Sequence, residues 1–127
     1  MPRKPLILVV EDDPGLAWAT GCDLRASGYL AVLVSDGAAA LDFATEVQVD
    51  LIVLDLMMPV MDGWRFLQKR KTDPDLRRIP VIVATSSYED PQEVGPDVDA
   101  VLPKPLPRDV LVRSIEEALS RSRPTGK

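Results

Sequence analysis

The chain of 127 residues contains no histidine, and this absence excludes several kinds of chemistry. Without an imidazole there is no Ser-His-Asp triad, no histidine general base and no zinc site of the common kinds. The chain has a single cysteine, Cys22, so it cannot form an internal disulfide. Because Cys22 falls within an expected helix, we expect it to be a small buried apolar residue rather than a reactive thiol.

Two further absences limit location and partners. A membrane-spanning helix needs about 18 apolar residues in a row, and no apolar run in the chain is that long. The apolar run near the start ends at Glu11, which is too early for a secretory signal. We therefore expect a cytoplasmic protein without membrane contact. The net charge of −5 disfavours direct nucleic-acid binding, since such binding uses Lys and Arg to neutralise phosphates. The basic clusters at 69–71 and 77–78 are expected to be a solvated helix end and a loop.

Short apolar runs alternate with longer amphipathic segments, which is typical of an α/β fold with a parallel sheet. The expected strands are 6–10, 30–35, 51–54, 79–84 and 100–102. The expected helices are 14–27, a segment after 36–37, 62–71 and a last helix from about 107. We interpret 1–127 as a single domain with a core of about 5–120 and a frayed tail at 121–127.

Local signals set the ends of these elements. Asp13-Pro14 and Asp36-Gly37 are typical helix starts, and Gly28 is a typical stop after the first helix. We expect Leu41, Ala44 and Val47 to share the buried face of the second helix. We interpret Asp73-Pro74 as a loop, and Trp18 and Trp64 as residues that pack helices onto the sheet. In 86–97, Pro91, Gly95 and Pro96 leave room for about one helical turn.

Carboxylates follow two of the expected strands. Glu11 and Asp12 come after strand 6–10, and Asp55 ends strand 51–54. Ligand crevices of open α/β sheets lie outside the carboxyl ends of the strands. Like charges gathered there require a cation or protons, and an all-oxygen site suits Mg²⁺. Lys104 follows a third apolar run and stands between prolines, so the sequence predicts a site with acids, a metal, a nucleophile and a lysine.

Four segments together resemble the receiver domain of bacterial two-component response regulators. They are 9–13, then 55 with 58–59 and 62–63, then 79–85, then 102–105. The resemblance covers nearly the whole chain. Within this family, the chain most resembles the stand-alone chemotaxis regulators. It implies a flavodoxin-like, doubly wound, five-stranded parallel sheet of order 2-1-3-4-5. The prolines in 86–97 predict that the helix between strands 4 and 5 is short or irregular in this chain.

The resemblance also implies a phosphoacceptor and a metal site. Asp55 resembles the aspartate that takes the phosphoryl group. Glu11 and Asp12 resemble the acidic pair that holds Mg²⁺, with Asp55 and the backbone carbonyl of Met57 as further ligands. The neighbouring Asp13 is expected to cap a helix instead.

Two further residues match the family pattern. Thr85 resembles the hydroxyl that donates to a phosphoryl oxygen, and Lys104 resembles the lysine that pairs first with the acceptor and then with the phosphoryl group. The Lys-Pro bond at this position, Lys104-Pro105 here, is commonly cis in the family. The chain departs from the pattern in having only 18 residues between Thr85 and Lys104, and in having Val101 where an aromatic residue is common.

The resemblance implies a phosphorylation-dependent signalling module rather than an enzyme that turns over an external substrate. Its partners would be a histidine kinase or histidine phosphotransfer protein and a downstream protein target, with the chain as a monomer or weak dimer. One alternative is an interaction module of the same fold that signals without phosphate. Another is an aspartate-nucleophile phosphohydrolase of the haloacid-dehalogenase type, which Met57 argues against because an acid/base residue is usual there.

Overall fold

The computed structural model describes residues 3–56, 63–85 and 98–122. Within them the strands form one all-parallel sheet of order β2-β1-β3-β4-β5, which confirms the predicted order. The strands are β1 Leu6–Val10, β2 Leu30–Val34, β3 Leu51–Leu54, β4 Val81–Thr85 and β5 Ala100–Pro103. β1, β3 and β4 are buried along their whole lengths, which explains their uninterrupted apolar sequences.

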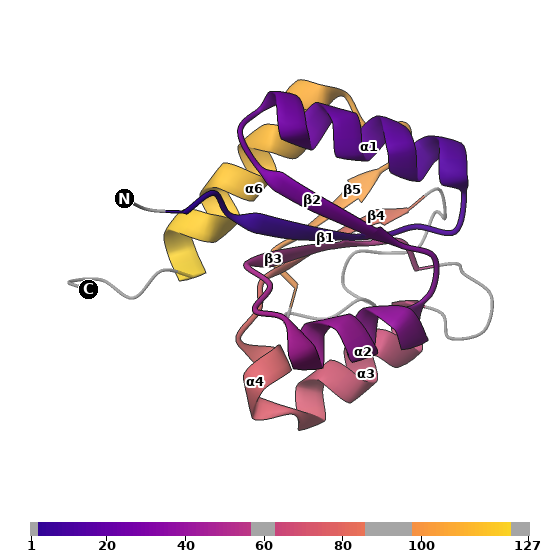
Figure 1. Cartoon of the computed structure of the whole chain (residues 1–127), viewed down its shortest axis with the longest axis vertical. Coiled ribbons are helices and arrows are strands. Elements are labelled where there is room, and N and C mark those ends of the chain that lie inside the picture. The colour runs from indigo at the N-terminus through magenta and orange to yellow at the C-terminus, as the bar shows by residue number, and fades with distance from the viewer. Residues whose placement is uncertain (1–2, 57–62, 86–97, 123–127) are drawn as a thin grey trace.

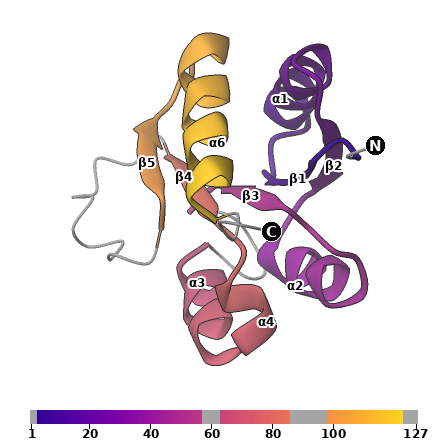
Figure 2. The same cartoon turned by 90° about the vertical axis from the view of Figure 1, so that its left-hand side faces the viewer.

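Helices cover both faces of the sheet (Figures 1 and 2). One face carries α1 Pro14–Ala26 and α6 Arg108–Ser122, and the other carries α2 Gly37–Glu46, α3 Gly63–Thr72 and α4 Pro74–Arg77. Alternate residues of β1 serve the two layers, since Leu8 and Val10 join the core beneath α2 and α3 while Ile7 and Val9 join the core beneath α1 and α6. None of the helices in the described ranges is long and apolar enough to cross a bilayer.

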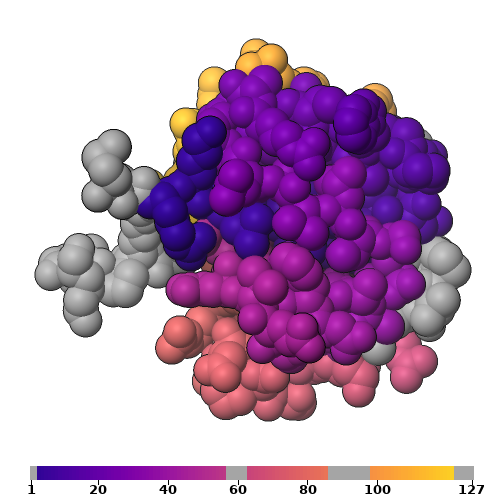
Figure 3. Space-filling view, viewed as in Figure 1, coloured from indigo at the N-terminus to yellow at the C-terminus, as the bar shows by residue number. Residues whose placement is uncertain are grey.

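The first half of the chain forms most of one molecular face. In the space-filling view its indigo-to-magenta atoms, from β1 to α2, make a continuous surface with the pink α3–α4 segment below (Figure 3). The spaces between the ribbons of Figure 1 are therefore filled by side chains on this face.

The predicted helix signals are confirmed where the structure describes them. The Asp13 carboxylate accepts from the N–H groups of Gly15 and Leu16 at 2.9 and 3.1 Å, and the Asp36 carboxylate accepts from Ala39 at 2.8 Å. Gly28 has a φ of 97°, so it supplies the left-handed residue that ends α1.

Carboxylates also bind the backbone at the amino ends of the strands. Asp50 Oδ2 accepts from the Leu6 N–H at 2.7 Å, and Asp99 Oδ1 accepts from the Val81 N–H at 3.2 Å. Each acid pairs with an arginine, Arg3 at 3.3 Å and Arg121 at 3.5 Å. The acids at the amino ends of the strands thus bind backbone N–H groups, while the carboxyl ends of the strands carry the acidic cluster.

Three expectations about element ends were wrong. The Asp73-Pro74 loop is the start of helix α4, because Asp73 accepts from the N–H groups of Asp75 and Leu76 and the Leu76 side chain is buried. Val47 lies beyond α2 as its exposed C-cap residue. The last helix extends through Ser122, past the expected start of the tail.

Two expectations about α1 were also wrong. Trp18 is 62% exposed and Cys22 is exposed, although we expected both to pack inside. The buried residues of α1 are Ala17, Gly21 and Leu24, and Trp18 and Cys22 each follow one of these positions and so turn outward. Trp64, in contrast, packs against the core as expected.

The basic end of α3 is not wholly solvated. Arg70 is only 3% exposed, and its Nη2 donates to the carbonyls of Ile79 at 2.7 Å and Arg77 at 3.1 Å. The interpretation of 69–71 as a solvated helix end was therefore wrong for Arg70, which ties α3 to the chain that leads into β4.

Candidate functional site

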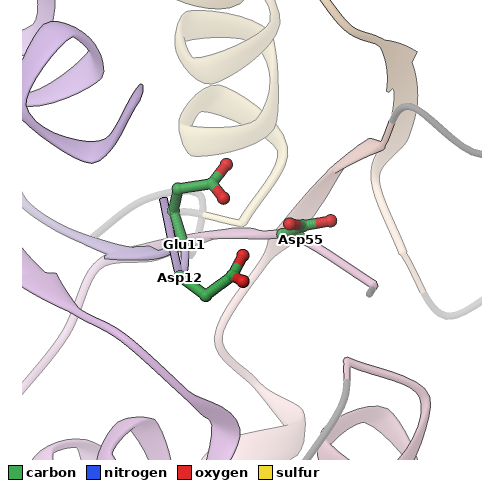
Figure 4. A group of neighbouring side chains, drawn as sticks. All are labelled: Glu11, Asp12 and Asp55. Atoms are coloured by element: carbon green, nitrogen blue, oxygen red, sulfur yellow. The ribbon is translucent and has the colours of Figure 1, made fainter. Parts of the chain in front are cut away.

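Strand pairing brings two acidic positions together at the carboxyl edge of the sheet. Val10 of β1 stands opposite Leu54 of β3, so the residues that follow them, Glu11 and Asp55, become neighbours. The Asp55 N–H donates to the Val10 carbonyl at 3.0 Å, which continues the ladder to the acid itself. Figure 4 shows the side chains of Glu11, Asp12 and Asp55 at this edge, as the sequence predicts.

The three carboxylates form a cluster that suits a divalent cation. Each offers one oxygen, and these oxygens all lie within 4.8 Å of one another. Glu11 and Asp55 are each 7% exposed, whereas Asp12 is open to solvent. Acids withdrawn from water need compensating positive charge, and a donor set made only of oxygens fits Mg²⁺. Met57, the expected carbonyl ligand, lies outside the described residues.

Lys104 brings a positive charge to the same acids. Its Nζ donates to Glu11 Oε1 and lies 3.4 Å from Asp55 Oδ2. The pairing with Asp55 agrees with the expectation, whereas the pairing with Glu11 was not predicted, because no feature of the sequence sets the distance between residues 93 positions apart. The Lys104-Pro105 peptide bond is cis, as the resemblance implied.

Burial and nearby charges shift the pKa values of Glu11 and Lys104. Burial raises the pKa of Glu11, and the bonds from Lys104 and from the Asp13 N–H only partly offset it, so this pKa lies above its usual value. Burial lowers the pKa of Lys104, but the bond to Glu11 and the charges of Asp55 and Glu11 outweigh it, so this pKa also lies above its usual value. Lys104 therefore stays positively charged at neutral pH.

Thr85 is the last residue of β4, and Lys104 directly follows the neighbouring strand β5. Thr85 is buried at the end of β4, and its carbonyl accepts from the Lys104 N–H at 2.9 Å. Because β4 also pairs with β3, the Thr85 hydroxyl belongs to the same edge of the sheet as Asp55. Val101 of β5 is partly buried against the core, and segment 86–97, where we expected a short crossover, lies outside the described residues.

Asp13 takes no part in the acidic cluster. Its carboxylate caps α1, as expected, while its N–H donates to Glu11 Oε2 at 3.2 Å. Asp13 thus caps the helix with its carboxylate and bonds Glu11 Oε2 with its N–H, while Glu11 Oε1 accepts from Lys104.

One further residue touches the site and was interpreted from the sequence only as part of a helix start. Gly63 begins α3, and its N–H donates to the Leu56 carbonyl at 2.9 Å. The Asp62-Gly63 pair was the available signal, but sequence alone does not show which backbone the glycine meets.

Comparisons with known proteins agree with this geometry. Residues 7–116 match the family model described as the response regulator receiver domain. The chain is 36% identical to the transcriptional regulatory protein GlrR of Escherichia coli (strain K12), over 98% of this chain and 28% of that protein. It is 34% identical to the transcriptional regulatory protein BaeR of Escherichia coli O6:H1, over 96% of this chain and 51% of that protein. The chain thus spans between about a quarter and a half of these two relatives.

Solved structures show the same fold. The signal receiver domain of a signal transduction histidine kinase from Syntrophus aciditrophicus has a TM-score of 0.86 and 35% identity, covering 97% of this chain and 96% of that one. The receiver domain of a sensor histidine kinase from Pseudomonas aeruginosa PAO1 has a TM-score of 0.84 and 29% identity, covering 92% and 98%. That second structure is described with a magnesium ion coordinated in its active site cleft.

Proposed function

We propose, because the chain belongs to the response regulator receiver domain family of two-component signalling, that it accepts a phosphoryl group on Asp55 and then changes its binding to another protein. The observation that carries the proposal is the position of Asp55, a buried carboxylate at a strand end with the Lys104 ammonium 3.4 Å away and two further acids beside it. The family acts as a signalling module, and we infer that the chemistry is limited to phosphorylation and dephosphorylation of this residue.

The proposed transfer needs one nucleophile and several charge-pairing groups. A carboxylate oxygen of Asp55 bonds to phosphorus as the P–N bond of a phosphohistidine donor breaks, and the departing imidazole keeps the electron pair of that bond. Lys104 lies close enough to Asp55 to pair with the phosphoryl oxygens, and the Thr85 hydroxyl would donate to one of them. The product is an acyl phosphate, which water hydrolyses, so the signal resets.

The acidic cluster has a separate role in this proposal. Mg²⁺ would be held by the carboxylates of Glu11, Asp12 and Asp55 and by the carbonyl of Met57. When bound, it neutralises negative charge on the transferring group. The magnesium ion in the Pseudomonas aeruginosa receiver domain supports this assignment.

Incubation with acetyl phosphate tests the function without a protein donor. We expect intact-mass spectrometry to show a single added phosphoryl group in Mg²⁺ and none when EDTA removes the metal, because the clustered acids otherwise repel the anionic donor. An adduct formed equally well in EDTA would refute the role of the acidic cluster. No adduct in either condition would refute the function and favour a module of the same fold that signals without phosphate.

The surface beside the site suggests where a phosphodonor protein would bind. Leu16 and Trp18 on the first turns of α1 are 46% and 62% exposed, and α1 starts directly after the acidic residues. A donor that presents its phosphohistidine to Asp55 must cover this edge, and tryptophan is among the residues that contribute most to protein interfaces. We infer that a histidine kinase or phosphotransfer protein contacts Trp18. The cytoplasmic location stays a prediction.

The Trp18→Ala variant separates docking from chemistry. We expect its phosphorylation by a histidine phosphotransfer protein to slow by about tenfold or more, since loss of such a side chain costs about 2 kcal/mol of binding. Its phosphorylation by acetyl phosphate should be unchanged, because that donor needs no protein surface. Val47→Ala, which removes an exposed apolar side chain at the end of α2, is the matched control. Equal rates for both variants with the protein donor would contradict this docking site.

A further inference from the structure

Gly63 lies against the backbone of the proposed acceptor. A Cβ at this position would stand 2.5 Å from the Asp55 carbonyl oxygen and 2.6 Å from the Leu56 Cα, closer than side chains approach backbone atoms. A Cβ at Gly21 would meet only the side chain of Leu33, at 3.2 Å, and one at Gly15 would meet only the Asp13 carboxylate, at 3.3 Å. Compared with Gly15, Gly21 and Gly28, Gly63 is thus set apart by contact with backbone at the site.

The requirement for glycine at 63 is steric and not conformational. In the described part of the chain, the glycine with positive φ is Gly28, and Gly63 is the first residue of a helix. Alanine is a better helix former than glycine. An alanine at 63 would therefore be favourable for α3 if the Asp55 and Leu56 backbone were not in the way.

Both sides of this contact are anchored. The Gly63 N–H donates to the Leu56 carbonyl, and α3 is held to the core by the buried side chains of Phe66 and Leu67. On the other side, the Asp55 N–H is bonded to β1. An added Cβ must therefore either displace the end of β3 or break the bond between α3 and Leu56.

We infer that Gly63 is a positioning residue, whose missing side chain lets α3 hold the Asp55 backbone where its carboxylate reaches Lys104 and the acidic cluster. The inference rests on the proposed function of Asp55. The Lys104 to Asp55 distance is already 3.4 Å, so a displacement of about 1 Å would separate the two groups, and errors of that size cost about 100-fold in rate.

The test compares Gly63→Ala with two controls. Gly21→Ala places the same methyl group in a helix away from the site, and Asp50→Ala removes the bond to Leu6 at the opposite edge of the sheet and so lowers stability without touching the site. Each protein is assayed well below its melting temperature, with sucrose added where a variant melts early, since excluded solutes favour the folded state.

We expect Gly63→Ala to react with acetyl phosphate at least tenfold more slowly than Asp50→Ala, even where their melting temperatures match. We also expect its amide NMR signals to shift at Asp55 and Lys104, with Gly21→Ala unchanged at both. Wild-type rates and unshifted signals in Gly63→Ala would overturn the inference. If the wild type itself forms no adduct, the proposed function fails, and the Asp55 and Lys104 signals still decide whether Gly63 positions them.

Discussion

The Asp55→Asn variant is expected to form no phosphoryl adduct under conditions in which the wild type is fully modified. An amide has no carboxylate oxygen to attack phosphorus, and asparagine occupies nearly the same volume, so the buried position at the end of β3 should stay filled. Intact mass after incubation with acetyl phosphate and Mg²⁺ gives the result directly. We expect complete loss of the phosphoryl adduct, which is the largest effect on activity that we predict for any substitution.

The matched control for this experiment is Asp42→Asn, which alters an aspartate on α2, away from the acidic cluster, and should leave the adduct unchanged. Both variants should retain the wild-type circular dichroism spectrum. An adduct on the wild type that peptide analysis maps to Asp12 would show that the exposed acid and not the buried one is the acceptor. The preference for Asp55 rests on its position near the Lys104 ammonium.

The Arg70→Met variant is expected to lose about 2–4 kcal/mol of unfolding free energy, the largest effect on stability. Methionine fills much of the space but donates no hydrogen bond, so the carbonyls of Ile79 and Arg77 lose the guanidinium. Bonds from a charged donor contribute about 1.5–3 kcal/mol each, and a buried acceptor left without a partner adds a desolvation cost. Urea unfolding followed by circular dichroism measures the loss.

Lys69→Met is the matched control, because Lys69 is the exposed neighbour of Arg70 on the same helix and should change stability by less than about 0.5 kcal/mol. Folded Arg70→Met should still be phosphorylated by acetyl phosphate at the wild-type rate, since Arg70 lies at the other end of α3 from Gly63. Equal stabilities of the two variants would mean that the buried guanidinium contributes nothing net, as some buried charges do.

The strands and the acidic positions at their ends could be predicted because their signals are local, whereas the order of the strands came from the family resemblance. Continuous apolar runs mark central parallel strands, and a carboxylate directly after such a run must lie at the strand end, as Glu11 and Asp55 do. Helix starts were equally local, since an aspartate before proline or glycine bonds the next free N–H groups. The same rule applied to Asp73-Pro74 would have predicted α4.

The residues that were misinterpreted depend on which way a helix faces. In α3 the buried positions are Gly63, Phe66, Leu67 and Arg70, a regular helical spacing that places the arginine in the apolar stripe despite its charge. In α1 the stripe consists mostly of small residues, so the large Trp18 was assigned to the interior when it stands outside. At both positions the helical spacing indicates correctly whether the side chain is buried, whereas the size of the tryptophan and the charge of the arginine do not.

The bond between the Lys104 N–H and the Thr85 carbonyl has an evolutionary consequence. The spacing of these two residues is set by the register of β4 and β5, in which Thr85 stands opposite Pro103, and not by the length of chain that joins the strands. Insertions or deletions within 86–97 can therefore accumulate without moving the hydroxyl or the ammonium. We therefore expect the length of 86–97 to be free to vary in evolution while the positions of Thr85 and Lys104 are kept.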